Sequence, residues 1–164
     1  MSNKIYPIGI QNFEKIRKGG YCYIDKTAWI YQMVKTGSYY FLSRPRRFGK
    51  SLLLSTLEAY FQGKKKLFEG LAIEKLEKDW FKYPILHIDL NTEKYDTPER
   101  LENKLNRTLV EWEKIYGAES AETSLAMRFE GIIQRACEKE GQSVVILVDE
   151  YDKPMLQAIG NDEL

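Results

Sequence analysis

The sequence predicts an α/β fold in which helices alternate with the strands of a mainly parallel sheet. The first observation is a set of three short apolar runs, at 39–43, 85–90 and 143–148, rich in the aromatic and β-branched residues that favour strands. The second is that stretches with apolar residues at helical spacing separate these runs. Strands joined through helices are usually parallel, so we expect three layers, with helices covering the sheet.

Four helices are expected around these strands. Each begins near a residue that caps helices well, such as Asp25, Thr27 or Ser124, and each ends at a glycine. Pro98 directly follows Thr97 and strengthens one of the starts, because its fixed φ angle suits the first helical position. The expected helices run from 25–27 to about Thr36, from the end of 44–51 to Gly63, from Thr97 to about Tyr116, and from about Ser124 to Glu140.

Composition indicates one soluble domain. The chain has 164 residues, of which 43% are hydrophobic and 30% charged, and its net charge is +1. This balance gives no overall attraction to nucleic acid or to an anionic membrane. The charge is nevertheless split, because residues 1–66 carry 13 basic and 3 acidic side chains, whereas the remainder carries 12 and 21. A bound anion is therefore expected against the first segment.

Several classes of protein are excluded or disfavoured. Only Cys22, Cys137 and His87 could supply thiolate or imidazole ligands, which excludes a Cys/His zinc site and disfavours a disulfide scaffold. The lone histidine lies in an apolar run, where a packed strand histidine is the simpler interpretation than a Ser-His-Asp mechanism. No apolar run spans a bilayer and no leader pattern precedes the domain, so we expect a cytoplasmic protein without a membrane partner.

A phosphate-binding loop is predicted at 44–51, between the apolar run 39–43 and a helix. Glycine there lets the backbone approach a ligand, and the start of a helix offers free N–H groups and a positive dipole end. Lys50 would reach the β and γ phosphates, and the Ser51 hydroxyl would bind Mg²⁺. The alternative is an ordinary helix start, since Arg44 stands where the full motif has its first glycine. The expected nucleotide-binding residues are Arg46, Arg47, Phe48, Gly49, Lys50, Ser51 and Leu52.

Two acids follow the apolar run 144–148, as in a Walker B motif at 144–150. Strand ends in open α/β sheets are where ligands bind, so Asp149 is expected to hold Mg²⁺ and Glu150 to orient and polarise an attacking water. The alternative is that both acids cap the next helix. The two motifs together, each on its proper element, favour a nucleotide site in which Glu150 and Lys50 are the catalytic residues.

The motif segments Tyr23–Thr27, 44–52 and 148–154 closely resemble the predicted AAA-ATPase-like family of bacteria over nearly the whole chain. The resemblance implies a P-loop NTPase core spanning 1–164 as one domain, with ATP and Mg²⁺ as cofactors. It also implies that RPRRFGKS is the family's usual form of the Walker A loop, and that longer members carry a restriction-endonuclease-like domain downstream. The core is expected to be incomplete at its C-terminus, because only 151–164 follow the Walker B motif.

Three functions remain open at this point. The leading hypothesis is a Mg-dependent ATPase module that converts nucleotide state into a conformational or assembly change. The second is a nucleotide-gated binding module without turnover, acting with DNA or a homo-oligomer partner, and the third is a P-loop phosphotransferase with Asp89 near its acceptor. An arginine for catalysis would have to come from Arg46, Arg47 or a neighbouring subunit.

Some weaker candidates also have structural explanations. Lys64, Lys65 and Lys66 could contact nucleic acid, but lysines at a helix end also complement its dipole. Asp25 could touch a ribose, although a helix cap is the simpler role. An aromatic set could line an adenine pocket or simply pack on strands: Tyr21, Tyr23, Tyr39 and Tyr40.

Overall fold

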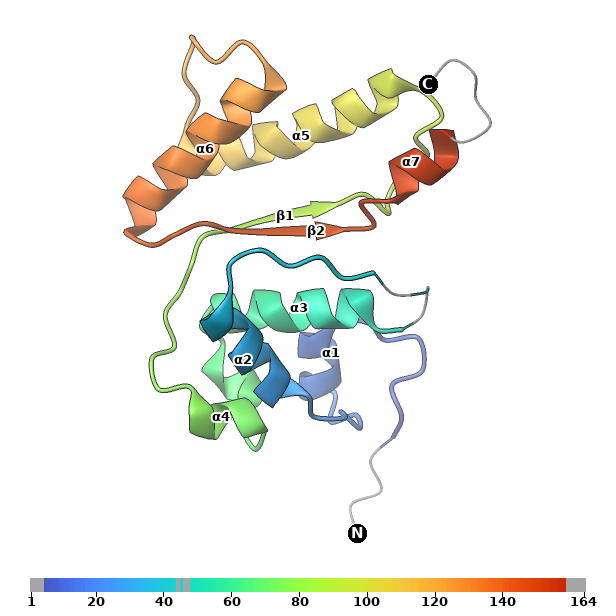
Figure 1. Ribbon diagram of the computed structural model, residues 1–164, viewed down its shortest axis with the longest axis vertical. Helices are drawn as coiled ribbons and strands as arrows, with labels where there is room; N and C mark the ends of the chain where they lie inside the picture. The colour runs from blue at the N-terminus through green and yellow to red at the C-terminus, as the bar shows by residue number, and fades with distance from the viewer. Residues whose placement is uncertain (1–4, 44, 46–47, 159–164) are drawn as a thin grey trace. The chain divides into compact units, whose positions relative to one another are not determined.

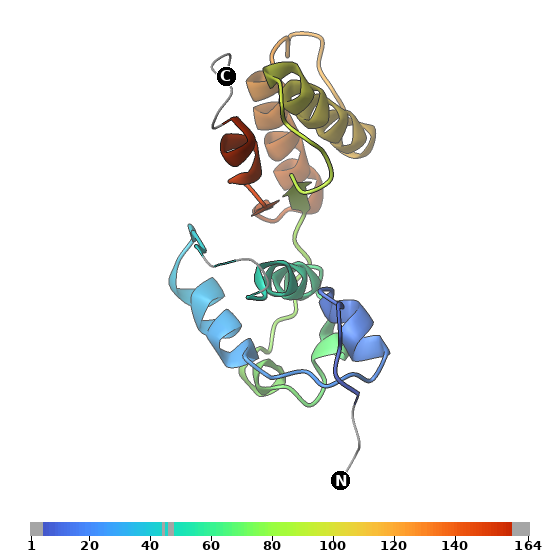
Figure 2. The ribbon, with the colours of Figure 1, turned by 90° about the vertical axis from the view of Figure 1, so that its right-hand side faces the viewer.

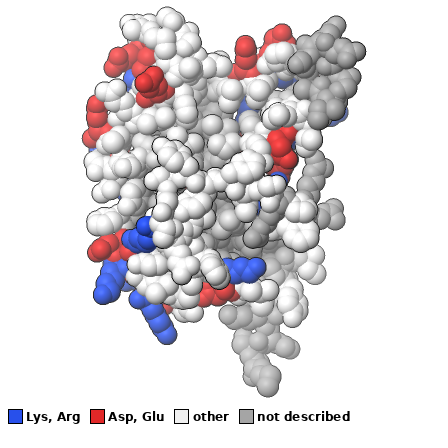
Figure 3. All heavy atoms as spheres, viewed as in Figure 1, with Lys and Arg blue, Asp and Glu red and all other residues white. Residues whose placement is uncertain are grey.

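The computed structural model describes residues 5–43, 45 and 48–158 of the chain. Contacts divide the chain into two compact units, Met1–Lys82 and Tyr83–Leu164, and each is described by itself (Figures 1 and 2). The described fold is mixed α/β, with a parallel sheet of two strands. On the face drawn in Figure 3, acidic side chains gather mainly on the second unit, and lysine and arginine mainly on the first.

The first unit is helical. Helix α1 packs on α3, and α2 packs on α4. Aromatic rings fill the space between them, with the Phe13 and Phe68 centroids 4.8 Å apart and those of Phe68 and Trp80 5.1 Å apart. The elements are α1 (Phe13–Lys18), α2 (Thr27–Thr36), α3 (Lys50–Phe61), the 3₁₀ helix η1 (Lys65–Phe68) and α4 (Ala72–Leu76).

The strand expected at 39–43 is wrong for this chain. The segment lies in no strand, and Tyr39 is 97% and Phe41 72% exposed. The Tyr40 hydroxyl instead donates a hydrogen bond to the Met33 carbonyl oxygen at 2.5 Å, which holds the segment against α2. A strand is stabilised by its neighbours in a sheet, and the apolar sequence of 39–43 cannot supply a neighbour by itself.

A buried carboxylate joins three helices of the first unit. Glu77 follows α4 and is only 4% exposed. Its Oε2 accepts a hydrogen bond from the Tyr60 hydroxyl of α3 and lies 3.0 Å from the Lys35 Nζ of α2. Its Oε1 accepts from the backbone N–H groups of Lys78 and Asp79 at 3.0 and 3.1 Å. Burial by itself raises the pKa of Glu77, but these partners bring it below its ordinary value of 4.5.

Replacing Glu77→Gln is expected to lower the free energy of unfolding by about 1–3 kcal/mol at neutral pH, because a buried charge-assisted network is lost. The lowered pKa makes the contribution of Glu77 present above its unfolded pKa near 4.5 and lost as pH falls through the folded value. Urea unfolding should therefore show that the variant has a lower free energy of unfolding than the natural chain at neutral pH. This difference should become smaller at acidic pH. Glu69→Gln, at an exposed position, is the control, and an equal deficit at both pH values would contradict the assignment.

The second unit holds the sheet. Strands β1 (Ile85–Asp89) and β2 (Val145–Asp149) are parallel and pair residue for residue, from Ile85 with Val145 to Asp89 with Asp149. Helices α5 (Pro98–Tyr116) and α6 (Leu125–Glu140) lie on the same face of this sheet (Figures 1 and 2). Helix α7 (Lys153–Ala158) follows β2. The predictions of α5 and α6 are confirmed, and Ser124 caps α6 by accepting the Met127 N–H at 3.2 Å.

The core of the second unit lies between β1 and the two long helices. Leu86 and Ile132 are fully buried, and Leu109 and Trp112 of α5 pack against them. Two arginines of α6 also tie the helices and their connection together. Arg128 Nε lies 2.6 Å from Glu113 Oε1, and Arg135 Nη1 lies 2.5 Å from Glu122 Oε1. These four side chains are mostly buried, so the ion pairs are only weakly screened by solvent.

Candidate nucleotide site

The predicted phosphate loop leads into the start of α3. Gly49 occupies the N-cap position with φ of +80°, a left-handed conformation that a residue with a Cβ adopts only under strain. Among the described residues no side chain caps the helix, and its first turn carries no acid. Lys50 opens the helix and Ser51 follows, both half-buried. The helix start therefore offers N–H groups and a positive dipole end that no side-chain cap has taken.

The position of α3 is fixed by a serine one turn further along. Ser55 Oγ accepts a hydrogen bond from the Phe13 N–H at 2.9 Å and lies 3.3 Å from the Gln11 carbonyl oxygen, to which it can donate. Buried Thr56 donates to the Leu52 carbonyl oxygen at 2.7 Å. These contacts hold the beginning of α3 on α1, so the loop ends on a rigid support.

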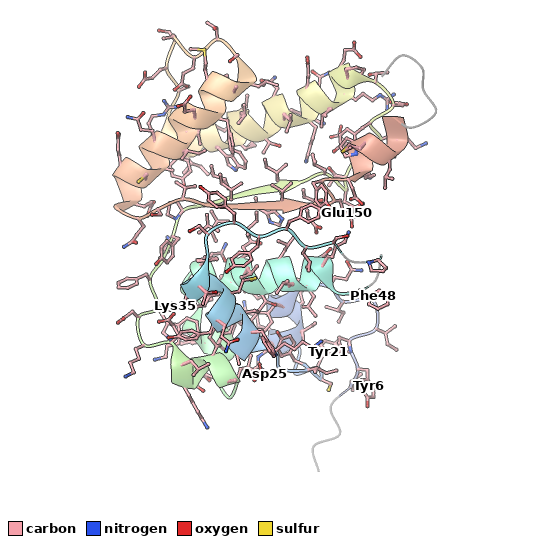
Figure 4. All side chains as sticks on the ribbon, in the orientation of Figure 1. Tyr6, Tyr21, Asp25, Lys35, Phe48 and Glu150 are labelled. Carbon is pink, nitrogen blue, oxygen red and sulfur yellow. The ribbon has the colours of Figure 1, made fainter. Side chains whose placement is uncertain are left out.

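The second motif lies at the end of β2. Asp149 Oδ1 accepts a hydrogen bond from the Glu150 N–H at 3.0 Å. Glu150 has φ of +55°, and it is the sole non-glycine with a positive φ in the part of the chain that the structure describes (Figure 4). The Lys153 N–H donates to the Glu150 backbone carbonyl at 3.0 Å. This bond to α7 thus uses the backbone of Glu150 and leaves its carboxylate for other partners.

The predicted site residues that the structure describes fall into two groups, one in each unit. Within the first unit the structure brings together 48–52, with Phe48 64% exposed at the beginning of α3 (Figure 4). Within the second unit it brings together Asp149 and Glu150. The two groups belong to different units, so each is described in its own surroundings. Arg44, Arg46 and Arg47 lie outside the described residues.

Asp89 is a further acid at the second position. It closes β1, directly beside Asp149 in the register of the sheet. Its Oδ1 accepts the Asn91 N–H at 2.8 Å. The sequence signal for it was weak, because one acid after a short apolar run has many explanations, and only the pairing of β1 with β2 brings the two carboxylates together.

Asp25 has a structural role, because both oxygens of its carboxylate accept hydrogen bonds within the first unit. Its Oδ1 accepts from the Thr27 N–H and hydroxyl at 2.8 and 2.7 Å, and its Oδ2 accepts from the Ala72 N–H at 2.7 Å. Burial raises the pKa of Asp25, but these hydrogen bonds lower it below its ordinary value. The side chain thus ties the start of α2 to the start of α4 (Figure 4), a structural role as expected, although Lys26 and not Asp25 occupies the N-cap position.

The aromatic set does not gather into one pocket. Tyr23 packs edge-on against Phe13, with ring centroids 5.1 Å apart, as the packing alternative predicts. Tyr21 crowds Gly19, where an added Cβ would meet its ring at 2.4 Å. Tyr39 is almost fully exposed, which neither alternative predicts.

The lysine run after α3 is engaged locally. Lys64 Nζ lies 2.6 Å from Glu14 Oε2, and Lys18 Nζ lies 2.5 Å from Glu14 Oε1. Hydrogen bonds from these two lysines lower the pKa of Glu14 to about 2. Lys65 and Lys66 open η1 and are exposed. From the sequence we expect Lys64 to complement the dipole of the helix. In the structure Lys64 forms an ion pair with Glu14, which holds the end of α3 against α1.

In the described part of the chain, no three acids, histidines or cysteines gather as ready-made metal ligands. Among the same residues, no helix has both the length and the apolar character needed to cross a membrane.

The fold and the two motifs define a class, a mixed α/β chain with a glycine-initiated helix after a basic loop and an acidic strand end. The chain belongs to the AAA-ATPase-like family, described as predicted AAA-ATPase, whose model matches residues 7–164. It is 42% identical over 166 residues to an uncharacterized protein in the vnfD 5′ region of Azotobacter chroococcum mcd 1. That alignment covers the whole of this chain and only 32% of the length of the relative. No solved structure matches the chain.

Proposed function

We propose that this chain is the nucleotide-binding part of a Mg-dependent ATPase that couples nucleotide state to a conformational or assembly change. The carrying observation is the start of α3, where a left-handed glycine precedes Lys50 and Ser51 and no side chain caps the helix. A helix start of this kind binds phosphate through its N–H groups. Family membership supports ATP as the nucleotide, and the two units would together form one P-loop domain over 1–164.

The residues present fit Mg-ATP. The backbone of 46–51 and the Lys50 ammonium would hold the phosphates, with Phe48 and Leu52 flanking them, and the Ser51 hydroxyl and Asp149 would hold Mg²⁺. The metal supplies charge neutralisation on the phosphates when it is bound. Close to the acidic strand end, Asp152 Oδ1 is buried with no hydrogen-bond partner among the described residues. This oxygen is therefore free to accept a hydrogen bond from a ligand or a water molecule.

Glu150 is the proposed catalytic base. Its left-handed backbone is held between the Asp149 carboxylate and the Lys153 N–H, which is the kind of local strain that persists at functional positions. Its carboxylate would orient an attacking water and accept its proton. Lys50 would stabilise the charge that develops on the transferred phosphate.

Replacing Glu150→Gln is expected to retain nucleotide binding and to remove turnover, because an amide is nearly isosteric but cannot act as a base. Asp149→Ala should instead weaken the Mg²⁺ dependence of binding. Binding and phosphate release are measured on the same samples of a longer protein that contains this chain, with Asp96→Asn as a control at an exposed position. Turnover at the normal rate in Glu150→Gln would assign the base to another residue.

A binding module without turnover is the second candidate. It is favoured by the small size of the sheet, two strands in the described residues, and by the segment 39–43, which lies in no strand. Such a module would hold ATP and pass its state to DNA, to a second copy or to a downstream nuclease-like domain. Transfer of labelled γ-phosphate to an acceptor other than water would instead favour a phosphotransferase, with Asp89 beside the acceptor.

A further inference from the structure

A lysine-rich surface lies on the first unit, where α1 meets the end of α3 and η1. Helix α1 packs on both α3 and η1, so two segments far apart in the sequence share this surface. The segments 13–18 and 64–69 together contain six basic and two acidic side chains. Lysine and arginine also gather mainly on the first unit in Figure 3. The lysine surface is formed by five exposed residues, Lys15, Lys18, Lys64, Lys65 and Lys66.

Measured contacts fix the two segments to each other. Glu14 Oε1 lies 2.5 Å from Lys18 Nζ, and Glu14 Oε2 lies 2.6 Å from Lys64 Nζ. One carboxylate therefore holds an ammonium group from each segment. The Arg17 Nε also donates a hydrogen bond to the Leu67 carbonyl oxygen at 2.7 Å, which attaches η1 to α1. The lysines of both segments are thus held on one surface.

The positive charge of this surface is only partly compensated. Glu14 balances one of its two lysines, and the side chains of Lys15, Lys65 and Lys66 form no ion pair or hydrogen bond among the described residues. The carbonyl ends of α1 and α3 also favour cations, but a helix end carries only about half a negative charge. Positive charge therefore remains, and it favours an anionic partner.

The side chains of the lysine surface favour a nucleic-acid duplex over a single strand. Proteins that bind single strands stack the bases on aromatic rings. The aromatic residues of the two segments, Phe13 and Phe68, are fully buried and cannot stack on a base. Ammonium groups act instead on phosphates, and duplex DNA carries about one negative charge per 1.7 Å of its axis. Contacts to the backbone alone read no base sequence.

We propose that the lysine surface binds the phosphate backbone of double-stranded DNA without sequence preference. The ammonium groups would neutralise phosphates and release their counterions, so the affinity should fall steeply as salt is added. The inference goes beyond the proposed function, because none of the five lysines belongs to the proposed nucleotide site.

The test is anisotropy of a short fluorescent DNA duplex titrated with this chain at several salt concentrations. The paired substitution Lys65→Ala and Lys66→Ala should weaken binding at least about tenfold at about 50 mM salt. It should also reduce the slope of log K against log salt by about 2, because each lost phosphate contact removes about 0.9. The pair Lys94→Ala and Lys114→Ala removes the same charge from exposed positions of the second unit and should bind as the natural chain does.

Three results would overturn the proposal: no duplex binding by the natural chain, an unchanged affinity in the Lys65 and Lys66 pair, or an equal loss in the control pair. Tighter binding of a single strand, a duplex RNA or polyglutamate would assign the surface to that partner instead and would also overturn it. The ATP affinity of the Lys65 and Lys66 pair should equal that of the natural chain.

A second variant keeps the test decisive if the paired substitution lowers the thermal unfolding midpoint. Lys15→Gln changes the other segment of the lysine surface and retains a long polar side chain. It should reduce the salt slope by about 1. An unchanged slope in Lys15→Gln would overturn the shared surface.

Discussion

Lys50→Ala is expected to weaken Mg-ATP binding by about 10- to 100-fold, the loss of a charged hydrogen-bonding partner of phosphate. Lys50 opens α3 directly after Gly49, where the N–H groups and the dipole of the helix act on the same ligand. Anisotropy of a fluorescent ATP analogue measures the affinity. Lys66→Ala removes an exposed lysine of the same unit and is the matched control.

An unchanged affinity in Lys50→Ala would mean that the phosphates bind elsewhere. The thermal unfolding midpoint of the variant should stay near that of the natural chain, because Lys50 is half-buried and belongs to no ion pair among those described. A parallel fall in affinity and stability would instead assign Lys50 a structural role.

The second large effect is on turnover. We expect this chain alone to release phosphate far more slowly than about 1 per second, a common enzyme scale. Strand β2 has β1 as its one neighbour in the described sheet, and Ile146 and Val148 are 44% and 38% exposed although they share a face with buried Leu86. These exposed apolar residues, and the segment 39–43 that lies in no strand, support an incomplete sheet.

The comparison is between this chain and a longer protein, such as the relative of which it spans 32%. A completed sheet and a catalytic arginine from a neighbour would raise the rate, and such an arginine is worth on the order of 10³ or more. Phosphate release is measured for both, with Glu150→Gln as the blank. Turnover near 1 per second from the short chain as a monomer would contradict the expectation. Concentration-dependent association of the short chain would support the inference that one edge of its sheet is exposed.

The helices α2, α3, α5 and α6 were predictable because their signals are local, whereas α1, η1 and α4 were not expected. Thr97 precedes α5, Pro98 begins it and Gly117 follows it, while Ser124 and Gly141 bound α6. Each of these residues acts within a turn of its own position, so the sequence alone is enough to place the boundary. The parallel pairing of β1 and β2 likewise follows from two apolar runs separated by helices.

The segment 39–43 shows the limit of prediction from local sequence. Its aromatic residues favour a strand, but a strand also needs a partner, and the described sheet contains none for it. Glu77 is a similar case, because its partners Lys35 and Tyr60 lie on other helices far away in the sequence. No pattern within one stretch predicts such a network.

The candidate site was predictable in part for the same reason. Gly49, Lys50 and Ser51 form one motif, and the left-handed glycine at the start of α3 agrees with it. Asp149 and Glu150 follow their strand as expected. The position of Asp89 beside Asp149 depends on strand register, which has no signature in the sequence.

The most direct test of Mg-ATP binding is calorimetric titration of this chain with ATP, ADP and GTP, each with and without Mg²⁺. We expect one molecule of ATP bound per chain, more tightly with Mg²⁺ than without, and little heat from Lys50→Ala under the same conditions. Absence of binding by the natural chain, or equal binding by the natural chain and Lys50→Ala, would contradict this expectation.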